Sequence, residues 1–191
     1  MQGFARELRR IRAGAVVLAG SLIAGCAGMG VGMEGAEVPE RIHVVSQSDS
    51  HLTVVDPAAG KVVERVPVGE TPTYNAVTPD GEYVLVTSTG EERLYVIETR
   101  YWEVVERLKL GDTPKGVEVT PGGRFVYAIN EGPESNSVDI FRVGTWEHVK
   151  EIRVGKRPHN VAFDPGRKLA YVSNGGSNTV SRIRYTDHSY R

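Results

Sequence analysis

Five histidines could support acid–base or metal chemistry, and their spacing decides which. None has the His-x-x-x-His spacing that directs two imidazoles at one ion, so the sequence predicts no metal site. His159 has the best functional case, since it follows Pro158 and precedes Asn160 in a segment that repeats along the chain. A histidine can act as a general acid or base, but the sequence names no partner for it. His148, next to Glu147, is expected to be solvated.

Polar residues recur at this position in the neighbouring repeats: Tyr74 and Asn75, then Lys115, then His159 and Asn160. If the repeats surround a central channel, these five side chains converge at its mouth and could bind a ligand there. Ordinary polar turn chemistry is the alternative. The chain has no nucleophile elbow, P-loop or carboxylate pair, so no catalytic residue and no cofactor is assigned. This pattern favours a binding role over an enzymatic one.

The overall charge argues against one large class of partner. Lys and Arg total 23 against 24 Asp and Glu, a net charge of −1. A protein without an excess of basic residues is not expected to bind nucleic acid. Hydrophobic residues make up 40% and charged residues 25%, which is typical of a folded globular protein.

Residues 1–25 have the pattern of an export signal. Four arginines precede an apolar run over residues 13–25, too short to span a bilayer. The run ends at the single cysteine, Cys26, in Leu-Ile-Ala-Gly-Cys, which resembles a bacterial lipobox. We therefore expect lipidation of Cys26 and a membrane anchor; the alternative is a spacer cysteine after an ordinary signal peptide. Ala27, by the same resemblance, favours the outer membrane over the inner one, with the protein facing the periplasm.

A glycine-rich tether is predicted over residues 26–40, and a repeat begins after it. A Gly-x-x-Pro turn recurs at Gly69, Gly111 and Gly155, 42 and 44 residues apart, and short β-rich runs fill the intervals. Four short strands per period of about 40 residues are typical of β-propeller blades, an all-β fold. The fourth run of each unit carries charges, so we expect it to be outermost. The units cover about residues 41–69, 70–111, 112–155 and 156–191.

The last unit carries a family resemblance. Tyr171-Val172-Ser173-Asn174, with Ser177 to Val180 after it and Pro158 to Gly166 before it, resembles the YVTN family of β-propeller repeats. That family usually forms seven-bladed rings. It is similar to surface-layer propellers, exported propellers associated with DNA or peptidoglycan, the haem propeller of nitrite reductases, and proteins that accompany quinone-dependent dehydrogenases. Streptogramin-inactivating lyases carry a catalytic histidine on a comparable Pro-His element.

The resemblance leaves three functions open. We expect an exported, lipid-anchored binding or scaffolding module of the bacterial cell envelope, with a protein or small-molecule ligand. The first alternative is an enzyme or redox-accessory propeller that holds a ligand or cofactor at the channel mouth. The second is a non-functional truncated fragment.

The repeat region is short for such a ring. Its 151 residues correspond to about 3.5 four-stranded blades and 14 expected strand segments. A truncated seven-bladed parent, a strained four-bladed ring and pairing with another chain all remain open. Arg182 stands where earlier units have Val54, Val96 and Ile140, which suggests a frameshift or an early end; a divergent tail is the alternative. Open blade edges would promote self-association.

Two tryptophans recur with the repeat. Trp102 and Trp146 both lie in the turn before a fourth run, 44 residues apart, and Ala59 is expected at their position in the first unit. We expect packing between repeats rather than a sugar-binding platform.

Overall fold

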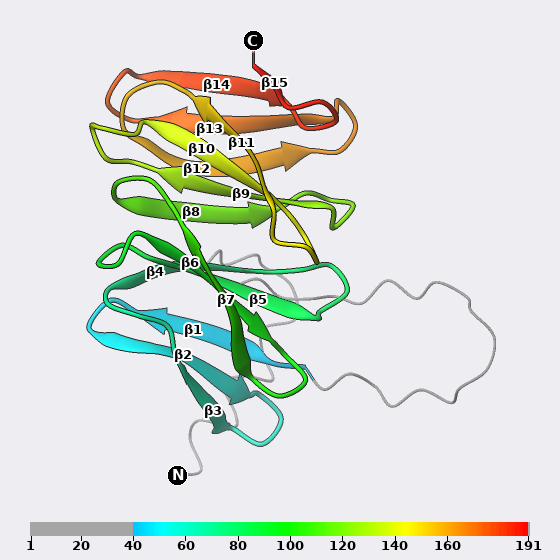
Figure 1. Cartoon of the computed structure of the whole chain (residues 1–191). Helices are drawn as coiled ribbons and strands as arrows, with labels where there is room; N and C mark the ends of the chain where they lie inside the picture. Colours follow the sequence, from blue (N-terminus) through cyan, green and yellow to red (C-terminus); the bar gives the residue numbers. More distant parts are fainter. Residues whose placement is uncertain (1–39, 191) are drawn as a thin grey trace, which may run out of the picture.

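The computed structural model describes residues 40–190, which fold into fifteen β-strands in four antiparallel sheets (Figure 1). The expected export signal, Cys26 and nearly all of the expected tether lie outside these residues. Blade 1 contains β1 (Ile42–Ser46), β2 (Asp49–Asp56) and β3 (Lys61–Pro67). Blade 2 contains β4 (Pro72–Val77), β5 (Tyr83–Ser88), β6 (Arg93–Glu98) and β7 (Glu103–Lys109). Blade 3 contains β8 (Pro114–Val119), β9 (Phe125–Asn130), β10 (Ser137–Arg142) and β11 (His148–Arg153). Blade 4 contains β12 (Pro158–Asp164), β13 (Leu169–Asn174), β14 (Thr179–Arg184) and β15 (Ser189–Tyr190).

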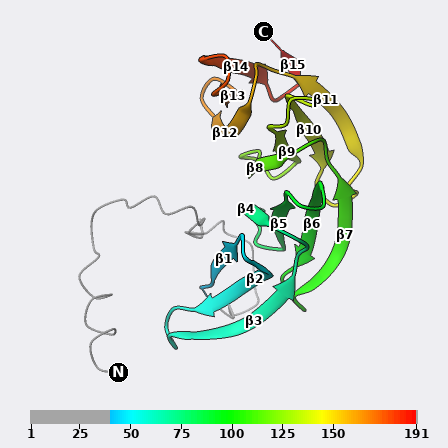
Figure 2. The ribbon, with the colours of Figure 1, turned by 90° about the vertical axis from the view of Figure 1, so that its left-hand side faces the viewer.

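The four blades follow one another around an open arc, which Figure 2 shows from the side. Strands β4, β8 and β12 lie on its inner side, where β8 contacts both β4 and β12. The outer strands β3, β7 and β11 lie on the convex side. Blades 1 and 4 stand at opposite ends, so residues 40–190 form part of a ring and not the closed four-bladed ring that the sequence left open.

An apolar core lies between each pair of neighbouring blades. Because side chains alternate along a strand, each central strand contributes one row to the preceding blade and one row to the next. Burying a valine or leucine in this way stabilises the protein by about 1.5–3 kcal/mol, and neighbouring blades thereby hold each other in place. The cores are built from Leu52 and Val54 with Val84 and Val86, from Leu85 and Leu94 with Val126 and Ala128, and from Ile129 and Ile140 with Val172 and Ile183.

The outer strands are largely exposed, as the charged fourth runs predicted. In β7 five of the seven positions are exposed, among them Glu106 and Arg107. Charges on an outermost strand oppose pairing with another sheet, because a second strand would have to desolvate them.

One turn repeats in all four blades, and in blades 2, 3 and 4 an aromatic side chain in this turn packs against the preceding blade. Gly60, Trp102, Trp146 and His188 have positive φ angles of 62°, 57°, 56° and 54° and share one place before the outer strand. The first unit therefore places Gly60 here, and the assignment of Ala59 was wrong. The three aromatic rings pack on the preceding blade, with ring centroids 5.6 Å apart for Trp102 and His43, 5.0 Å for Trp146 and Tyr83, and 4.5 Å for His188 and Phe125. The packing role expected for the two tryptophans is confirmed.

The end of the chain stays in register with the earlier units. Fourteen strand segments were expected, with the third run of the last unit incomplete, but β14 is full length and β15 follows it. Arg182 pairs with Tyr171 and is exposed, because it lies on the face of blade 4 directed away from blade 3. A charged residue in this strand is therefore compatible with the blade, and the loss of an apolar side chain at this position does not end the repeat.

Candidate functional site on the inner strands

Each inner strand is irregular at the positions that the sequence singled out. The register with the second strand shifts between Pro72 and Tyr74 in blade 2, between Pro114 and Val117 in blade 3, and between Pro158 and Val161 in blade 4. These irregularities contain Thr73–Tyr74, Lys115–Gly116 and His159–Asn160. A bulge bends the strand and redirects side chains, and bulges are frequent beside functional sites. The repeat therefore places a short irregular segment with polar residues at the equivalent position of the inner strand in three neighbouring blades.

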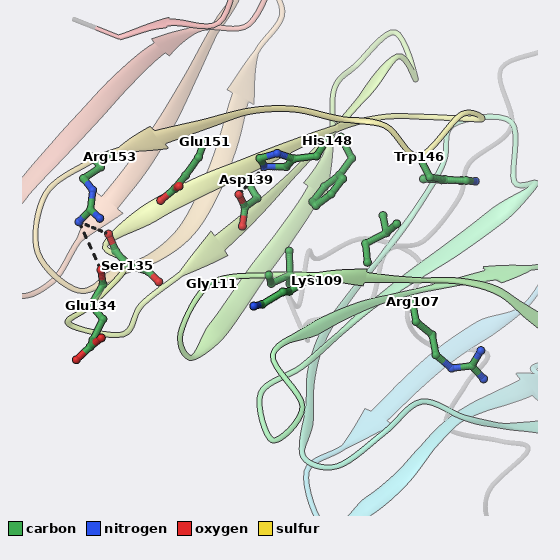
Figure 3. A pocket seen from close by; sticks show the side chains of 13 residues that line it. Arg107, Lys109, Gly111, Glu134, Ser135, Asp139, Trp146, His148, Glu151 and Arg153 are labelled. Carbon is green, nitrogen blue, oxygen red and sulfur yellow. Dashed lines mark hydrogen bonds and ion pairs between the residues drawn. The ribbon is translucent and has the colours of Figure 1, made fainter.

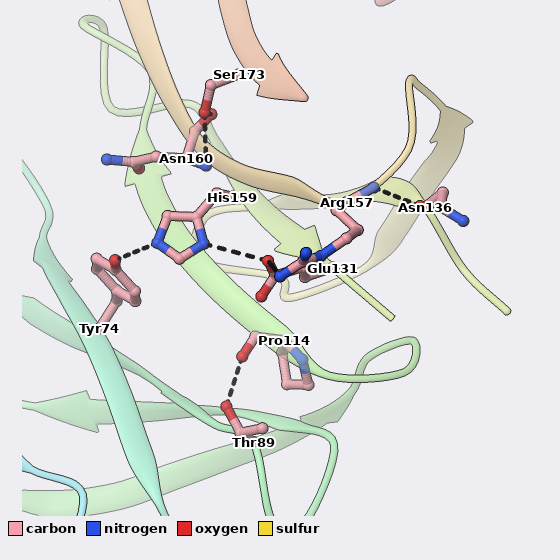
Figure 4. Close-up of polar contacts among 9 residues, drawn as sticks. All are labelled: Tyr74, Thr89, Pro114, Glu131, Asn136, Arg157, His159, Asn160 and Ser173. Atoms are coloured by element: carbon pink, nitrogen blue, oxygen red, sulfur yellow. Dashed lines mark hydrogen bonds and ion pairs between the residues drawn. The ribbon is translucent and has the colours of Figure 1, made fainter. Parts of the chain in front are cut away.

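Tyr74 and His159 meet across this surface although 85 residues separate them. The phenol oxygen of Tyr74 is 2.8 Å from Nε2 of His159, and the two rings are perpendicular, with centroids 5.8 Å apart (Figure 4). The His159 side chain is 49% exposed, so its ring is accessible to a ligand while held by the tyrosine. The structure thus brings together two of the five residues predicted to converge.

Glu131 joins this pair from the loop after β9. Its Oε1 lies 3.6 Å from Nδ1 of His159 and 3.6 Å from Nη2 of Arg157, and its side chain is only 16% exposed (Figure 4). The backbone N–H of Arg157 donates to Oδ1 of Asn136 at 2.7 Å, which fixes the start of the segment. The sequence analysis missed Glu131, because the equivalent residues of blades 2 and 4 are Thr89 and Gly175, so the repeat does not mark this position as charged. The chain Tyr74–His159–Glu131 crosses from blade 2 to blade 4.

Gly116 makes this crossing possible. It lies on β8 between the two partners, and a Cβ atom there would be 2.8 Å from the carbonyl oxygen of His159 and 2.7 Å from Oδ1 of Asn160. Such contacts are too close for any side chain, so a glycine is needed to let β12 approach. In the repeat Gly116 stands where Tyr74 and Asn160 stand in the neighbouring blades.

The other predicted residues lie on the same strands with different surroundings. The hydroxyl of Thr87 donates to the carbonyl oxygen of Lys115 at 2.8 Å, which ties the backbone of β8 to blade 2 and leaves the lysine side chain partly exposed. Asn160 is exposed, and its backbone N–H donates to Oγ of Ser173 at 3.3 Å. Asn75 is partly buried on β4, and its Oδ1 has no hydrogen-bond partner among the described residues.

This arrangement suits proton transfer or polar recognition. An imidazole with a phenol on one nitrogen and a carboxylate near the other is held in one orientation, and its tautomer follows from which neighbour it donates to. Lys115, Arg157 and His159 supply donors for an anionic or oxygen-rich ligand. Residues 40–190 contain no group of three or more metal-binding side chains. Over the same residues, no helix is long and apolar enough to cross a bilayer.

Comparisons with known structures identify the fold. Hydrazine synthase of Kuenenia stuttgartiensis superposes with a TM-score of 0.74 at 26% identity, over 78% of this chain and 44% of that protein. A protein of unknown function from Desulfotomaculum acetoxidans gives 0.70 at 20% identity, over 78% and 48%. The periplasmic gluconolactonase of Pseudomonas aeruginosa gives 0.67 at 18% identity, over 78% and 48%. The chain is a β-propeller. The propeller spans about half the length of these relatives.

A family model places part of the propeller more narrowly. The model described as a seven-bladed β-propeller lactonase matches residues 105–189, which include Glu131 and His159 but not Tyr74. A comparison with curated protein sequences finds no match.

Proposed function

We propose that this chain belongs to an exported, lipid-anchored β-propeller that binds a small anionic, hydroxyl-bearing ligand on its inner strands at the bacterial cell envelope. The observation that supports it most is the contact chain in which Tyr74 is hydrogen-bonded to His159 and the carboxylate of Glu131 lies 3.6 Å from the other ring nitrogen of His159. Such a chain across blades 2, 3 and 4 orders side chains on an accessible surface, where polar groups usually carry recognition and not stability. Lys115 and Arg157 add positive charge beside it.

The ligand class follows from the groups that face it. Two cations and an imidazole suit a carboxylate, while Tyr74 and Asn160 suit hydroxyl groups. A sugar acid combines both features, and one similar structure is a gluconolactonase. D-gluconate is therefore a suitable first probe.

Calorimetric titration of the protein with D-gluconate tests the binding role. We expect saturable binding, which His159→Ala and Lys115→Ala each weaken by roughly 5- to 100-fold, since a hydrogen bond to a charged group contributes about 1–3 kcal/mol. His51→Ala is the matched control, because His51 is a partly exposed histidine on blade 1, paired with Asp49 at 2.8 Å. Absence of binding, or equal loss in the control, would overturn the proposal for this ligand class.

The proposed location rests on the N-terminal pattern alone. A short apolar run behind four arginines and a lipobox-like Leu-Ile-Ala-Gly-Cys support export and a lipid on Cys26. A mildly charged propeller held at the membrane surface by such an anchor would meet its ligand in the periplasm.

Hydrolysis of a lactone is the second candidate, favoured by the lactonase model over residues 105–189. His159, held by Tyr74 and near Glu131, could activate water as a general base. Hydrolysis of D-glucono-1,5-lactone, followed by acid release, tests it. We expect His159→Ala to abolish catalysis and Glu131→Gln to lower kcat by roughly 10²–10⁴-fold if the carboxylate supports the base. A rate equal to the spontaneous one would reject the enzymatic role and leave the binding role in place.

A further inference from the structure

A second cavity lies on the far side of the blades, between blades 2 and 3. It has a volume of about 590 Å³, within the usual range for small-molecule sites. Leu108 and Leu110 of blade 2 and Phe141 of blade 3 line it. Trp146 and His148 also line it, together with the charged side chains of Arg107, Lys109, Glu151 and Arg153 (Figure 3). The inner-strand site contributes none of these residues.

The repeat shows what fills this space between blades 1 and 2. There Tyr95 on β6 is buried, with its hydroxyl beside Gly69 and bonded to the carboxylate of Glu91. The residue equivalent to Tyr95 in blade 3 is Asp139, and the residue equivalent to Gly69 is Gly111, which lines the cavity. Blade 3 thus lacks the phenol ring found one blade earlier, and the side chains of Ser135 and Asn130 lie beside Gly111 where the Tyr95 hydroxyl lies beside Gly69.

Asp139 also introduces a buried carboxylate at a position where blade 2 has the uncharged Tyr95. Its side chain is 9% exposed, with one oxygen 2.8 Å from Nε2 of His148 and the other accepting from Nδ2 of Asn130 at 2.8 Å. Blades 1 and 2 have Val62 and Val104 at the position of His148. A buried carboxylate costs free energy unless it is fully paired, so this departure from the repeat is not explained by packing.

The pair leaves the second ring nitrogen of His148, Nδ1, without a hydrogen-bond partner among the described residues. An ionised Asp139 accepts the Nε2 proton of His148, and Nδ1 of that ring becomes an acceptor. His148 is 48% exposed and packs on Phe141, with ring centroids 5.1 Å apart. His148 was expected to be solvated; the structure shows it half exposed and fixed by Asp139.

We propose that this cavity binds a small aromatic compound with a hydroxyl group. Its ring lies between the leucines of blade 2 and Phe141, in the space that Tyr95 fills one blade earlier, and its hydroxyl donates to Nδ1 of His148. The site does not depend on the function proposed for the inner strands.

Titration of the full chain with phenol and toluene, followed by protein NMR, tests this. We expect wild type to bind phenol about tenfold more tightly than toluene, because only phenol bonds to His148. His148→Val should remove that difference, as valine stands there in blades 1 and 2. Asp139→Tyr should abolish binding of both probes by placing its own ring where the ligand ring is proposed to lie. The control His51→Val removes another His–Asp pair with the same 2.8 Å separation and should bind like wild type.

Three results would overturn the proposal: no saturable phenol binding to wild type, unchanged binding to Asp139→Tyr, or a tenfold preference that survives His148→Val. If circular dichroism shows that Asp139→Tyr does not fold, Leu108→Trp decides instead. It fills the cavity from the opposite wall and should also exclude both probes.

Discussion

His43 makes the stability of the propeller sensitive to acid. The ring is 6% exposed between blades 1 and 2, faces Trp102, and neither ring nitrogen has a hydrogen-bond partner among the described residues. Burial lowers the pKa of His43 from 6.5 to about 4. The folded protein therefore keeps the His43 ring neutral. As the pH falls, this ring is protonated in the unfolded chain at a higher pH than in the folded protein.

The size of the effect follows from this difference in pKa. Because the folded pKa is depressed, the stabilisation is complete above pH 6.5 and is lost as the pH falls towards 4. At pH 4.5 the loss amounts to about 2–3 kcal/mol, and it approaches about 3 kcal/mol well below pH 4. His43→Leu removes this loss. It should also stabilise the protein at pH 7.5 by about 1–3 kcal/mol, since two buried nitrogens without partners disappear and the repeat has Leu85 at this place.

Urea unfolding at pH 7.5 and 4.5, followed by tryptophan fluorescence, measures both effects. The variant should lose about 2–3 kcal/mol less than wild type between the two pH values. Some loss should remain, because burial and the charge of Lys150 also lower the pKa of His188. His51→Leu leaves His43 in place and should behave like wild type. Equal loss in wild type and His43→Leu would refute the reasoning.

Three further outcomes are expected. Gly116→Val should destabilise the protein by about 1–3 kcal/mol and weaken any gluconate binding, because its Cβ meets the backbone of His159 and Asn160; unchanged unfolding and binding would contradict this. Cys26→Ser should abolish incorporation of radioactive palmitate, and equal labelling of both proteins would reject the lipid anchor. Light scattering should show self-association that Val44→Lys reduces, since Val44 is 45% exposed on the uncovered face of blade 1; a monomer at 0.1 mM would contradict it.

Periodicity predicted the blades because local and long-range signals coincide in a repeat. Each Gly-x-x-Pro turn and each apolar run recurs at nearly constant spacing. A strand whose bounds are ambiguous in one unit can therefore be assigned from the equivalent strands of the other units. The prediction for the last unit was wrong because Arg182 was compared with Ile140. Ile140 is buried because blade 4 packs against it, whereas the described residues include no blade after blade 4 to cover Arg182. Whether a strand position is covered depends on the neighbouring blade, which a pattern within one strand does not describe.

The site was predictable to the extent that the repeat positions it. Tyr74 and His159 lie in the equivalent irregular segments of two inner strands, one position apart in the repeat, so the fold brings their backbones to the same surface. Glu131 was not found, because its equivalents Thr89 and Gly175 carry no charge and the repeat therefore gave no signal at this position. Asp139 and His148 were also missed, although comparison with Tyr95 and Val104 would have marked both as departures from the repeat.

The most direct test of the inner-strand site is the imidazole NMR spectrum of His159 during titration with D-gluconate. Long-range proton–nitrogen spectra resolve individual histidine rings, and the His159→Ala variant assigns this one. The ring signals of His159 should shift saturably, while those of His43 and His148 stay in place, and Tyr74→Phe should weaken the response. Signals of His159 that remain unchanged at saturating gluconate, with binding detected elsewhere or not at all, would contradict the account.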